Sequence, residues 1–147
     1  LHATFYVSKH AIPLLKQQGG AIMNLSSTAG LFGYPMRSPY ASAKWAIVGL
    51  SKTMAMELGP FNVRVNCICP GSVNGERMDR VISSIAKATG ESLHKVRQDN
   101  VQNTSMTTFV DAEDIANMIL FSFSDLGAKI SGQSLTVDGD THSLATY

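Results

Sequence analysis

Segments with a helical residue pattern alternate with short apolar segments along the whole chain, and this alternation restricts the possible folds more than any other feature. Strands that alternate with helices pair in parallel through helical crossovers, so the sequence predicts an α/β fold around a parallel sheet. Periodicity and turn signals predict helices over residues 1–18, over 38–58 and from Asp111, and strands over 21–26, 62–69 and 133–137.

The helix over residues 38–58 has the clearest signals in the sequence. Ser38 is a suitable N-cap, and Pro39 fits the first helical position, where no backbone N–H is needed. Gly59 can adopt the left-handed conformation that ends a helix, and Pro60 cannot continue one. Between these ends an apolar stripe recurs at steps of three and four, comprising Ala43, Ile47, Leu50, Met54 and Leu58.

The remaining segments are predicted as loops and amphipathic helices. Glycine and proline within residues 27–37 predict a loop, and residues 76–103 predict one or two helices interrupted at Thr89-Gly90. Asp111 and Asp114 have the spacing of a capping box at the start of the next helix. The predicted buried side of that helix comprises Ile115, Met118, Ile119 and Phe123.

The predicted sheet is small for a parallel one. Only three strands are predicted, whereas parallel sheets have both faces covered, and the inner edge here would be bare. The chain also starts with Leu1, inside a predicted helix, rather than with Met. Both features predict that further strands precede these residues in the whole protein.

Residues 1–147 have the size of one ordinary domain, and 44% hydrophobic and 16% charged residues are typical of a globular protein. The net charge of +1 gives no electrostatic reason to expect a nucleic-acid partner. No apolar run approaches the roughly 18 residues that cross a bilayer, so no membrane span is predicted. The spacing of His2, His10 and His142 does not match that of metal ligands, so no metal is predicted either.

The two cysteines indicate the cellular compartment. Cys67 and Cys69 lie two residues apart in a predicted strand, so their side chains share one face. Neighbours at that spacing form a disulfide poorly. We interpret both as buried, reduced side chains, which predicts a cytoplasmic location.

Tyr40 and Lys44 lie four residues apart on the clearest helix, and therefore on one helix face. A cation beside a phenol favours the phenolate, so such a pair can exchange a proton near neutral pH. Ser27 follows a predicted strand, and functional groups of open α/β sheets gather at strand ends. A Tyr–Lys pair at this spacing is also common on solvated helix faces, so the pattern alone does not decide.

The surrounding residues resemble a known family. Residues 19–58, GGAIMNLSSTAGLFGYPMRSPYASAKWAIVGLSKTMAMEL, resemble the catalytic segment of short-chain dehydrogenases/reductases in N-L-S-S-x-A-G, in Y-A-S-A-K and in the spacing between Ser27 and Tyr40. VRVNCICPG resembles V-R-V-N-x-I-x-P-G of that family, and residues 132–139 resemble its closing G-Q-x-L-x-V-D-G. The resemblance implies a Rossmann-like, doubly wound parallel sheet, of which only the carboxyl-terminal strands and helices are present.

The resemblance also implies a reaction. An oxidoreductase dependent on NAD or NADP would interconvert a small secondary alcohol and a ketone by hydride transfer, with Tyr40 as general acid/base. Lys44 would favour the phenolate and hydrogen-bond the nicotinamide ribose, and Ser27 would polarise the reacting oxygen. Ser27, rather than Ser26, has the sequence spacing to the tyrosine that is typical of the family. The residues interpreted as structural are Asn24, Ser26, Arg64 and Asn66.

The resemblance implies cofactor contacts from the loop after the second strand. Pro70, Gly71 and Val73 match the family loop whose backbone meets the nicotinamide amide, and Tyr40 and Lys44 complete the implied cofactor-binding residues. Where the family often has Thr, this chain has Gly75, so one hydroxyl contact is lost or supplied elsewhere.

Several family features are absent from these residues. The phosphate loop T-G-x-x-x-G-x-G, the residue that separates NAD from NADP, and a catalytic Asn that would directly precede Leu1 are all missing. These residues alone are therefore predicted to be inactive. Members of the family usually form homodimers or homotetramers through the helices that correspond to residues 1–18 and 38–58.

Residues 75–105 occupy the position of the family's substrate lid. Basic residues slightly outnumber acidic ones there, which favours either an acidic substrate or an ordinary solvated helix face. The basic residues are Arg77, Arg80, Lys87, Lys95 and Arg97, and the acidic ones are Glu76, Asp79, Glu91 and Asp99.

Two other functions are considered. A dinucleotide-binding sensor or scaffold would keep the fold and lose Ser27, Tyr40 or Lys44, yet all three are present. A Ser–Lys hydrolase would use Ser27 as nucleophile and Lys44 as base, and would leave Tyr40 without a role. Labelling by a serine-directed reagent would identify the hydrolase.

Overall fold

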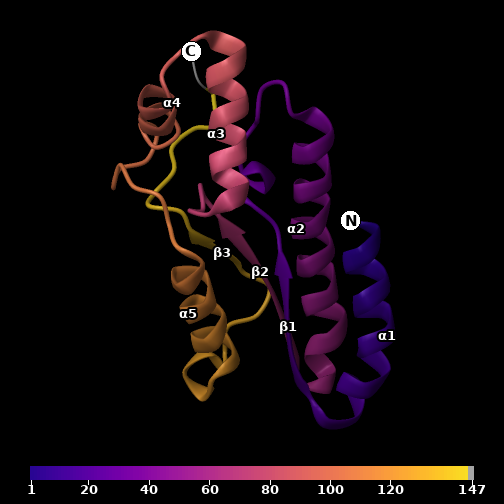
Figure 1. Cartoon of the computed structure of the whole chain (residues 1–147). Helices are drawn as coiled ribbons and strands as arrows, with labels where there is room; N and C mark the ends of the chain where they lie inside the picture. Colours follow the sequence, from indigo (N-terminus) through magenta and orange to yellow (C-terminus); the bar gives the residue numbers. More distant parts are fainter. Residues whose placement is uncertain (146–147) are drawn as a thin grey trace.

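A three-stranded parallel sheet forms the centre of the computed structural model, which describes residues 1–145 (Figure 1). The predicted α/β fold with parallel pairing is therefore confirmed. The strands, in sheet order, are β1 (Gly20–Leu25), β2 (Val63–Pro70) and β3 (Ser134–Val137). The helices are α1 (His2–Gln18), α2 (Ser38–Leu58), α3 (Glu76–Thr89), α4 (Leu93–Asp99) and α5 (Ala112–Phe123), and the 3₁₀ helices are η1 (Thr28–Gly30), η2 (Gly59–Phe61) and η3 (Asp125–Gly127).

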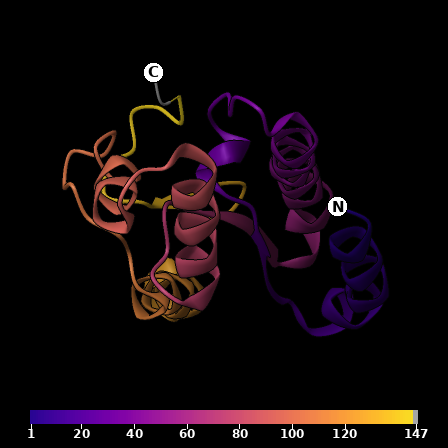
Figure 2. The same cartoon turned by 45° about the horizontal axis from the view of Figure 1, so that its top comes forward.

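Helices cover the sheet on two sides: α1 and α2 lie together on one face, and α5 lies on the other (Figures 1 and 2). The alternation of side chains along β2 explains this arrangement, since Val63 and Val65 pack against Met54 and Leu58 of α2. Every residue of β2 except Arg64 is buried, so β2 is the centre of the core.

The other face of β2 carries polar anchors. Arg64 donates to the backbone oxygens of Ser122 and Gly127, the latter at 2.9 Å. The Asn66 amide donates to the Ile130 oxygen at 2.8 Å and accepts from the Gln133 N–H at 3.0 Å. These side chains supply partners for buried backbone groups, which agrees with the structural role predicted for both.

The predicted bounds of α2, residues 38–58, are confirmed, whereas the capping differs from the sequence prediction at both ends. Ser38 is the first helical residue, and Arg37 occupies the N-cap position without a side-chain hydrogen bond. Gly59 keeps a right-handed conformation at φ −52°, and the chain continues as η2. Asn62 takes the left-handed conformation instead, at φ 56°, because asparagine tolerates that region and Pro60 fits the first turn of η2.

The predictions for the second half of the chain were partly correct. The helix break at Gly90 and the capping box of Asp111 and Asp114 are confirmed. Phe123, predicted to be buried, is 46% exposed. The fully buried residue of α5 is Ser122, whose carbonyl accepts a hydrogen bond from Arg64 of β2.

Candidate active site

The predicted site residues gather at the carboxyl ends of the strands. Ser27 follows β1, Tyr40 and Lys44 lie in the first two turns of α2, and Gly71 follows β2. A contact links two of these elements, since the Lys44 ammonium donates to the Leu25 carbonyl at the end of β1 at 3.1 Å. This is the edge of a parallel sheet where open α/β proteins place their ligands.

Ser27 has extended backbone geometry at φ −172° and forms the N-cap of η1. Its hydroxyl oxygen accepts a hydrogen bond from the Ala29 N–H at 3.2 Å. A hydroxyl that accepts in this way retains its own proton for donation. The 3₁₀ turn therefore orients Ser27 without using its donor capacity.

The ring of Tyr40 lies between a cation and a second aromatic ring. The Lys44 ammonium nitrogen is 5.6 Å from the Tyr40 ring centroid. The Tyr34 ring meets it edge to face, with centroids 6.4 Å apart and an interplanar angle of 75°. Tyr34 was not identified from the sequence, because residues 27–37 have no periodic pattern that predicts which side chains point at the helix.

Lys44 is anchored through its backbone as well as its side chain. Ser26, which is 4% exposed, donates its hydroxyl to the Lys44 carbonyl at 2.9 Å. A Cβ at Gly30 would lie 2.5 Å from the Ser26 oxygen and 2.8 Å from the Lys44 carbonyl oxygen. Only glycine fits there, so the segment from Ser26 to Gly30 lies directly against α2 at Lys44.

A second hydrogen bond joins β1 to α2 about two turns further along the helix, at Ser51. The Asn24 amide donates to the Ser51 hydroxyl at 2.9 Å, and that hydroxyl donates to the Ile47 carbonyl at 2.7 Å. Asn24 and Ser51 are both buried. The structural role predicted for Asn24 and Ser26 therefore consists in holding α2 against β1.

The two cysteines lie in the core next to the contact between β1 and α2, which is called the corner below. Cys67 and Cys69 are free thiols with no exposed surface, and they pack against Ile47 and Val48 of α2. The hydrogen bond that Cys69 forms with the Cys67 sulfur raises the pKa of Cys69, and burial raises it further. Both are reduced and buried, as the sequence predicted.

The loop after β2 is shaped by close backbone contacts. The Gly71 N–H donates to the Val137 carbonyl at 3.1 Å, and a Cβ at Gly71 would lie 2.8 Å from the Asp138 Cβ. Val73 pairs with Val110 as an isolated parallel bridge. The hydrogen bonds of that bridge use the Ser72 carbonyl and the Asn74 N–H, so the N–H and C=O of Val73 point away from Val110.

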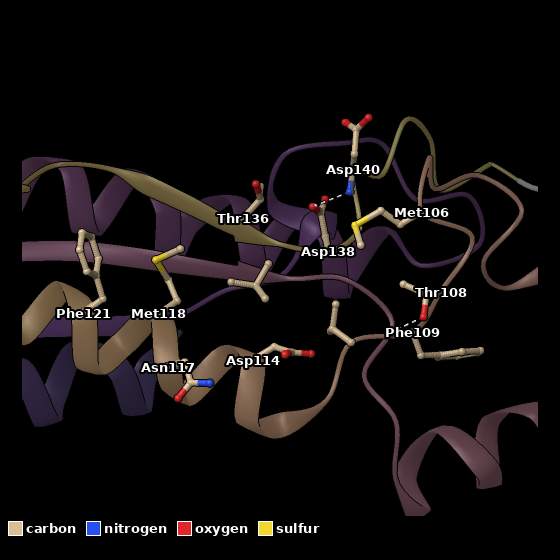
Figure 3. Close-up of a pocket in the computed structure, with 13 residues that line it drawn as sticks. Met106, Thr108, Phe109, Asp114, Asn117, Met118, Phe121, Thr136, Asp138 and Asp140 are labelled. Carbon is tan, nitrogen blue, oxygen red and sulfur yellow. Dashed lines mark hydrogen bonds between the residues drawn. The ribbon is translucent and has the colours of Figure 1, made fainter.

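A cavity of about 550 Å³ borders this loop, since Val110, Val137 and Asp138 line it (Figure 3). Met118 and Phe121 of α5 point toward β3 across it, and Asn117 of the same helix also lines it (Figure 3). None of the predicted catalytic residues lines it. Its acidic side chains already accept hydrogen bonds within the chain: Asp114 from the Asp111 N–H, Asp138 from the Thr141 N–H, and Asp140 from the Ser105 hydroxyl.

Two further predictions concern metals and membranes. Within residues 1–145, no group of three or more His, Cys, Asp or Glu side chains has an arrangement that could hold a metal ion. None of the helices in the described part of the chain combines the length and the apolarity needed to cross a bilayer.

Comparison with known proteins identifies the family. The model of a family described as enoyl-(acyl carrier protein) reductase matches residues 1–142. A trans-4-hydroxycyclohexanecarboxylate dehydrogenase of Sinomonas cyclohexanicum is 36% identical over 139 residues, which are 95% of this chain and 48% of the relative. The chain belongs to the short-chain dehydrogenase/reductase family. A second relative of the chain, a D-beta-hydroxybutyrate dehydrogenase of Rhizobium meliloti, is 34% identical over 95% of it and 55% of the relative.

Solved structures of short-chain dehydrogenases/reductases share the fold. L-Sorbose reductase from Gluconobacter frateurii, in complex with NADPH and L-sorbose, superposes with a TM-score of 0.88 at 25% identity, over 96% of this chain and 54% of that one. 4-Hydroxyisoleucine dehydrogenase in complex with NADH gives a TM-score of 0.75 at 32% identity, over 95% and 55%. The chain thus spans about half the length of the relatives it matches.

Proposed function

We propose that the protein containing this chain is an NAD- or NADP-dependent oxidoreductase that interconverts a small secondary alcohol and a ketone. The observation that supports this best is the position of Tyr40 against the Lys44 ammonium, 5.6 Å from ring centroid to nitrogen, at the carboxyl end of the sheet. Relatives of the chain are named as dehydrogenases of hydroxy acids and of a hydroxysteroid. Two structural neighbours hold NADH or NADPH.

In this proposal the three side chains divide the work of proton transfer. Tyr40 gives its phenolic proton to the carbonyl oxygen during reduction and takes it back during oxidation. Lys44 stabilises the phenolate that remains, because an ammonium beside a phenol favours the charged form. The free O–H of Ser27 donates to the reacting oxygen as negative charge develops there. The nicotinamide, when bound, supplies or accepts the hydride.

The chain's own residues fit the nicotinamide end of such a cofactor. Val73 directs its N–H and C=O away from Val110, which leaves them available for an amide group. The tight contact of Gly71 with Asp138 fixes Pro70 and the loop at the strand ends. We propose Pro70, Gly71 and Val73, together with Tyr40 and Lys44, as the cofactor contacts of this half of the site.

We further propose that residues 1–147 are part of one Rossmann-type domain, with a substrate lid over residues 75–105, and are inactive alone. Several side chains of α1 leave apolar surface uncovered: Phe5 is 46%, Val7 71% and Leu14 63% exposed. Val7 and Leu14, seven residues apart, share one side of α1, whereas Phe5 lies on the opposite side. Exposed apolar surface on this helix favours a homodimer or homotetramer that uses the two long helices. Two buried free thiols suit the reducing cytoplasm.

The hydrolase alternative receives no support from the site geometry. It requires Lys44 to take the proton of Ser27, whereas the Lys44 ammonium donates to the Leu25 carbonyl and the Ser27 oxygen accepts from the Ala29 N–H. A charged ammonium in that position is not a base.

The full-length Tyr40→Phe protein tests the proposal. Removing a general acid/base lowers turnover by a factor of about 10² to 10⁴, so kcat is expected to fall about 10³-fold. Activity is followed by the absorbance of reduced nicotinamide over a panel of cyclic and acyclic secondary alcohols, and dinucleotide binding by calorimetry. The control Tyr6→Phe removes an equivalent hydroxyl from the exposed face of α1 and should leave kcat unchanged.

Two results would contradict the proposal. One is a wild-type protein that binds neither NADH nor NADPH. The other is a Tyr40→Phe protein whose activity equals that of Tyr6→Phe. If dinucleotide binds and no alcohol is oxidised, the sensor function replaces the enzyme, and covalent labelling of Ser27 by a serine-directed reagent would indicate the hydrolase.

A further inference from the structure

Arg97, on α4, contacts three parts of the molecule outside its own helix. Its guanidinium donates to the Asp79 carboxylate of α3 at 3.0 Å and to the Asn74 side-chain oxygen at 2.8 Å. The same group lies 4.6 Å from the ring centroid of Phe109, in the segment that leads to α5. A planar guanidinium can make directed hydrogen bonds and stack on an aromatic face at the same time.

Asn74, in the loop 72–74 that follows β2, connects Arg97 to the start of α5. Its side-chain N–H donates to the Asp111 carboxylate at 2.7 Å, and its backbone N–H donates to the Val110 carbonyl at 2.9 Å. Asp111 is the N-cap of α5. Asn74 also directly follows Val73, the proposed contact of the nicotinamide amide. The Arg97 side chain is thus separated from that contact by a single residue.

The charges around Arg97 argue against a binding site for an acidic substrate group. Asp79 already neutralises Arg97, and Lys95 is paired with both Glu91 and Asp99 on its own helix. Arg80 is likewise paired with Glu76. Most of the basic excess in the lid is therefore matched locally, which favours the solvated-face interpretation of these charges over the acidic substrate.

We propose that Arg97 is a positioning residue that fastens lid helix α4 to the loop 72–74, so that the lid and the nicotinamide loop open and close as one unit. The role of the loop rests on the proposed function, whereas the mechanical tie rests on contacts of the chain alone. The side chains of Arg97 and Asp79 are 44% and 63% exposed, so this ion pair adds little to the stability of the whole fold and its removal should leave the protein folded.

Hydrogen exchange of the full-length protein without cofactor tests the tie directly. The Asn74 N–H, bonded to Val110, and the Val110 N–H, bonded to the Ser72 carbonyl, report on the loop. The Val96 and Asn100 N–H groups report on α4. In Arg97→Met, which keeps the apolar stem, exchange at both pairs of amides is expected to accelerate about tenfold, because local opening sets the exchange rate.

The matched control is Lys95→Met on the same helix. Lys95 also has two ion pairs, but both partners, Glu91 and Asp99, lie within or beside α4. Its loss should change exchange of the α4 amides at most and leave Asn74 and Val110 as in the wild type. If Arg97→Met leaves the loop amides unchanged, or if Lys95→Met accelerates them equally, the proposed tie does not exist.

Cofactor titration then separates this inference from the proposed function. NADH or NADPH should slow exchange at Val96 in the wild type and not in Arg97→Met, and the KM for dinucleotide should rise about fivefold in that variant while kcat changes less than about twofold. Arg97→Lys keeps the positive charge but cannot donate to Asp79 and Asn74 through two nitrogens of one planar group, so its KM for dinucleotide should lie between those of the wild type and Arg97→Met. A wild-type protein without dinucleotide affinity would refute the proposed function and leave the result on the tie intact.

Discussion

The corner between β1 and α2 and the proposed lid, formed by α3 and α4, are held together in different ways. In the corner, buried side chains bond to backbone or to each other: Ser26 to the Lys44 carbonyl, and Asn24 to Ser51. In the lid, exposed charged side chains bond to other exposed side chains, as Arg97 does to Asp79 and Lys95 to Glu91.

These two kinds of bond give the two regions different rigidity. A backbone acceptor inside a helix moves only when the helix moves, so the corner fixes the ammonium and the phenol in a preorganised arrangement. Exposed ion pairs contribute little stability and exchange with water readily. The proposed lid could therefore reopen at small cost, whereas the corner that holds Tyr40 and Lys44 cannot rearrange without partial unfolding.

The largest expected effect concerns the close approach at Gly30. Gly30→Ala places a Cβ 2.5 Å from the Ser26 oxygen and 2.8 Å from the Lys44 carbonyl oxygen, so α2 must shift. Overpacking of this kind costs about 1–3 kcal/mol, and we expect the upper part of that range in urea unfolding. Gly33→Ala is the control, since its added Cβ meets nothing within 4 Å. Equal stability of the two variants would show that the corner is not rigid.

The next effect concerns the buried tie at Ser51. Ser51→Ala removes the acceptor of the Asn24 amide and leaves that N–H buried without a partner. An unsatisfied buried donor costs about 1–3 kcal/mol, so a loss of about 2 kcal/mol is expected in denaturant unfolding. Thr53→Ala removes a similar hydroxyl-to-carbonyl bond on the exposed side of the same helix and should change stability by less than about 0.5 kcal/mol.

A pH dependence should come from the thiols under the corner. The pKa of Cys69 is raised in the folded protein by its hydrogen bond to Cys67 and by burial, whereas in the unfolded chain it ionises near its usual value of about 8.5. Above that pH the unfolded state binds fewer protons, so stability falls as pH rises, by up to about 1.4 kcal/mol per unit.

Cys69→Ala removes this ionisation. The variant is expected to be less stable than the wild type at pH 7 and to lose less stability between pH 8.5 and 10. Parallel pH curves for the two proteins, measured by chemical denaturation, would show that the Cys69 thiol does not carry the effect.

The smallest effect belongs to the lid. Lys95→Gln breaks two exposed ion pairs, and stability should change by less than about 0.5 kcal/mol because solvent screens both. Differential scanning fluorimetry at low and high salt measures this change. A loss as large as that of Ser51→Ala would remove the distinction between the two regions.

The sequence predicted the corner better than the lid. Apolar periodicity identified α2, and a family motif placed Ser27, Tyr40 and Lys44 around the end of β1. Both signals come from residues that are close together in the sequence, so they can be recognised without knowing the fold. The motif did not reveal that Gly30 touches the Lys44 carbonyl or that Tyr34 packs on Tyr40, since both contacts depend on how the loop folds back.

The errors share a physical origin. Ser38 is a good N-cap residue, yet Arg37 occupies the N-cap position. Gly59 is the C-cap of α2 as predicted, but the left-handed conformation expected there falls at Asn62, after η2. Several neighbouring residues can cap each end of this helix, and the packing of α2 against the sheet determines which of them does so. The partner of Arg97 lies 23 positions away at Asn74, and no sequence pattern specifies a contact between two exposed side chains at that separation.

The pairing register of β2 has a consequence for how the protein folds. β2 must align with Gly20–Leu25 on one side and with Ser134–Val137 on the other, and each alignment closes a long intervening segment. Contacts between distant positions form slowly, so the nearly fully buried V-R-V-N-C-I-C run stays exposed until both segments have closed. Refolding yield should therefore decline as protein concentration rises, because unpaired copies of this strand can associate with one another before their own neighbours arrive.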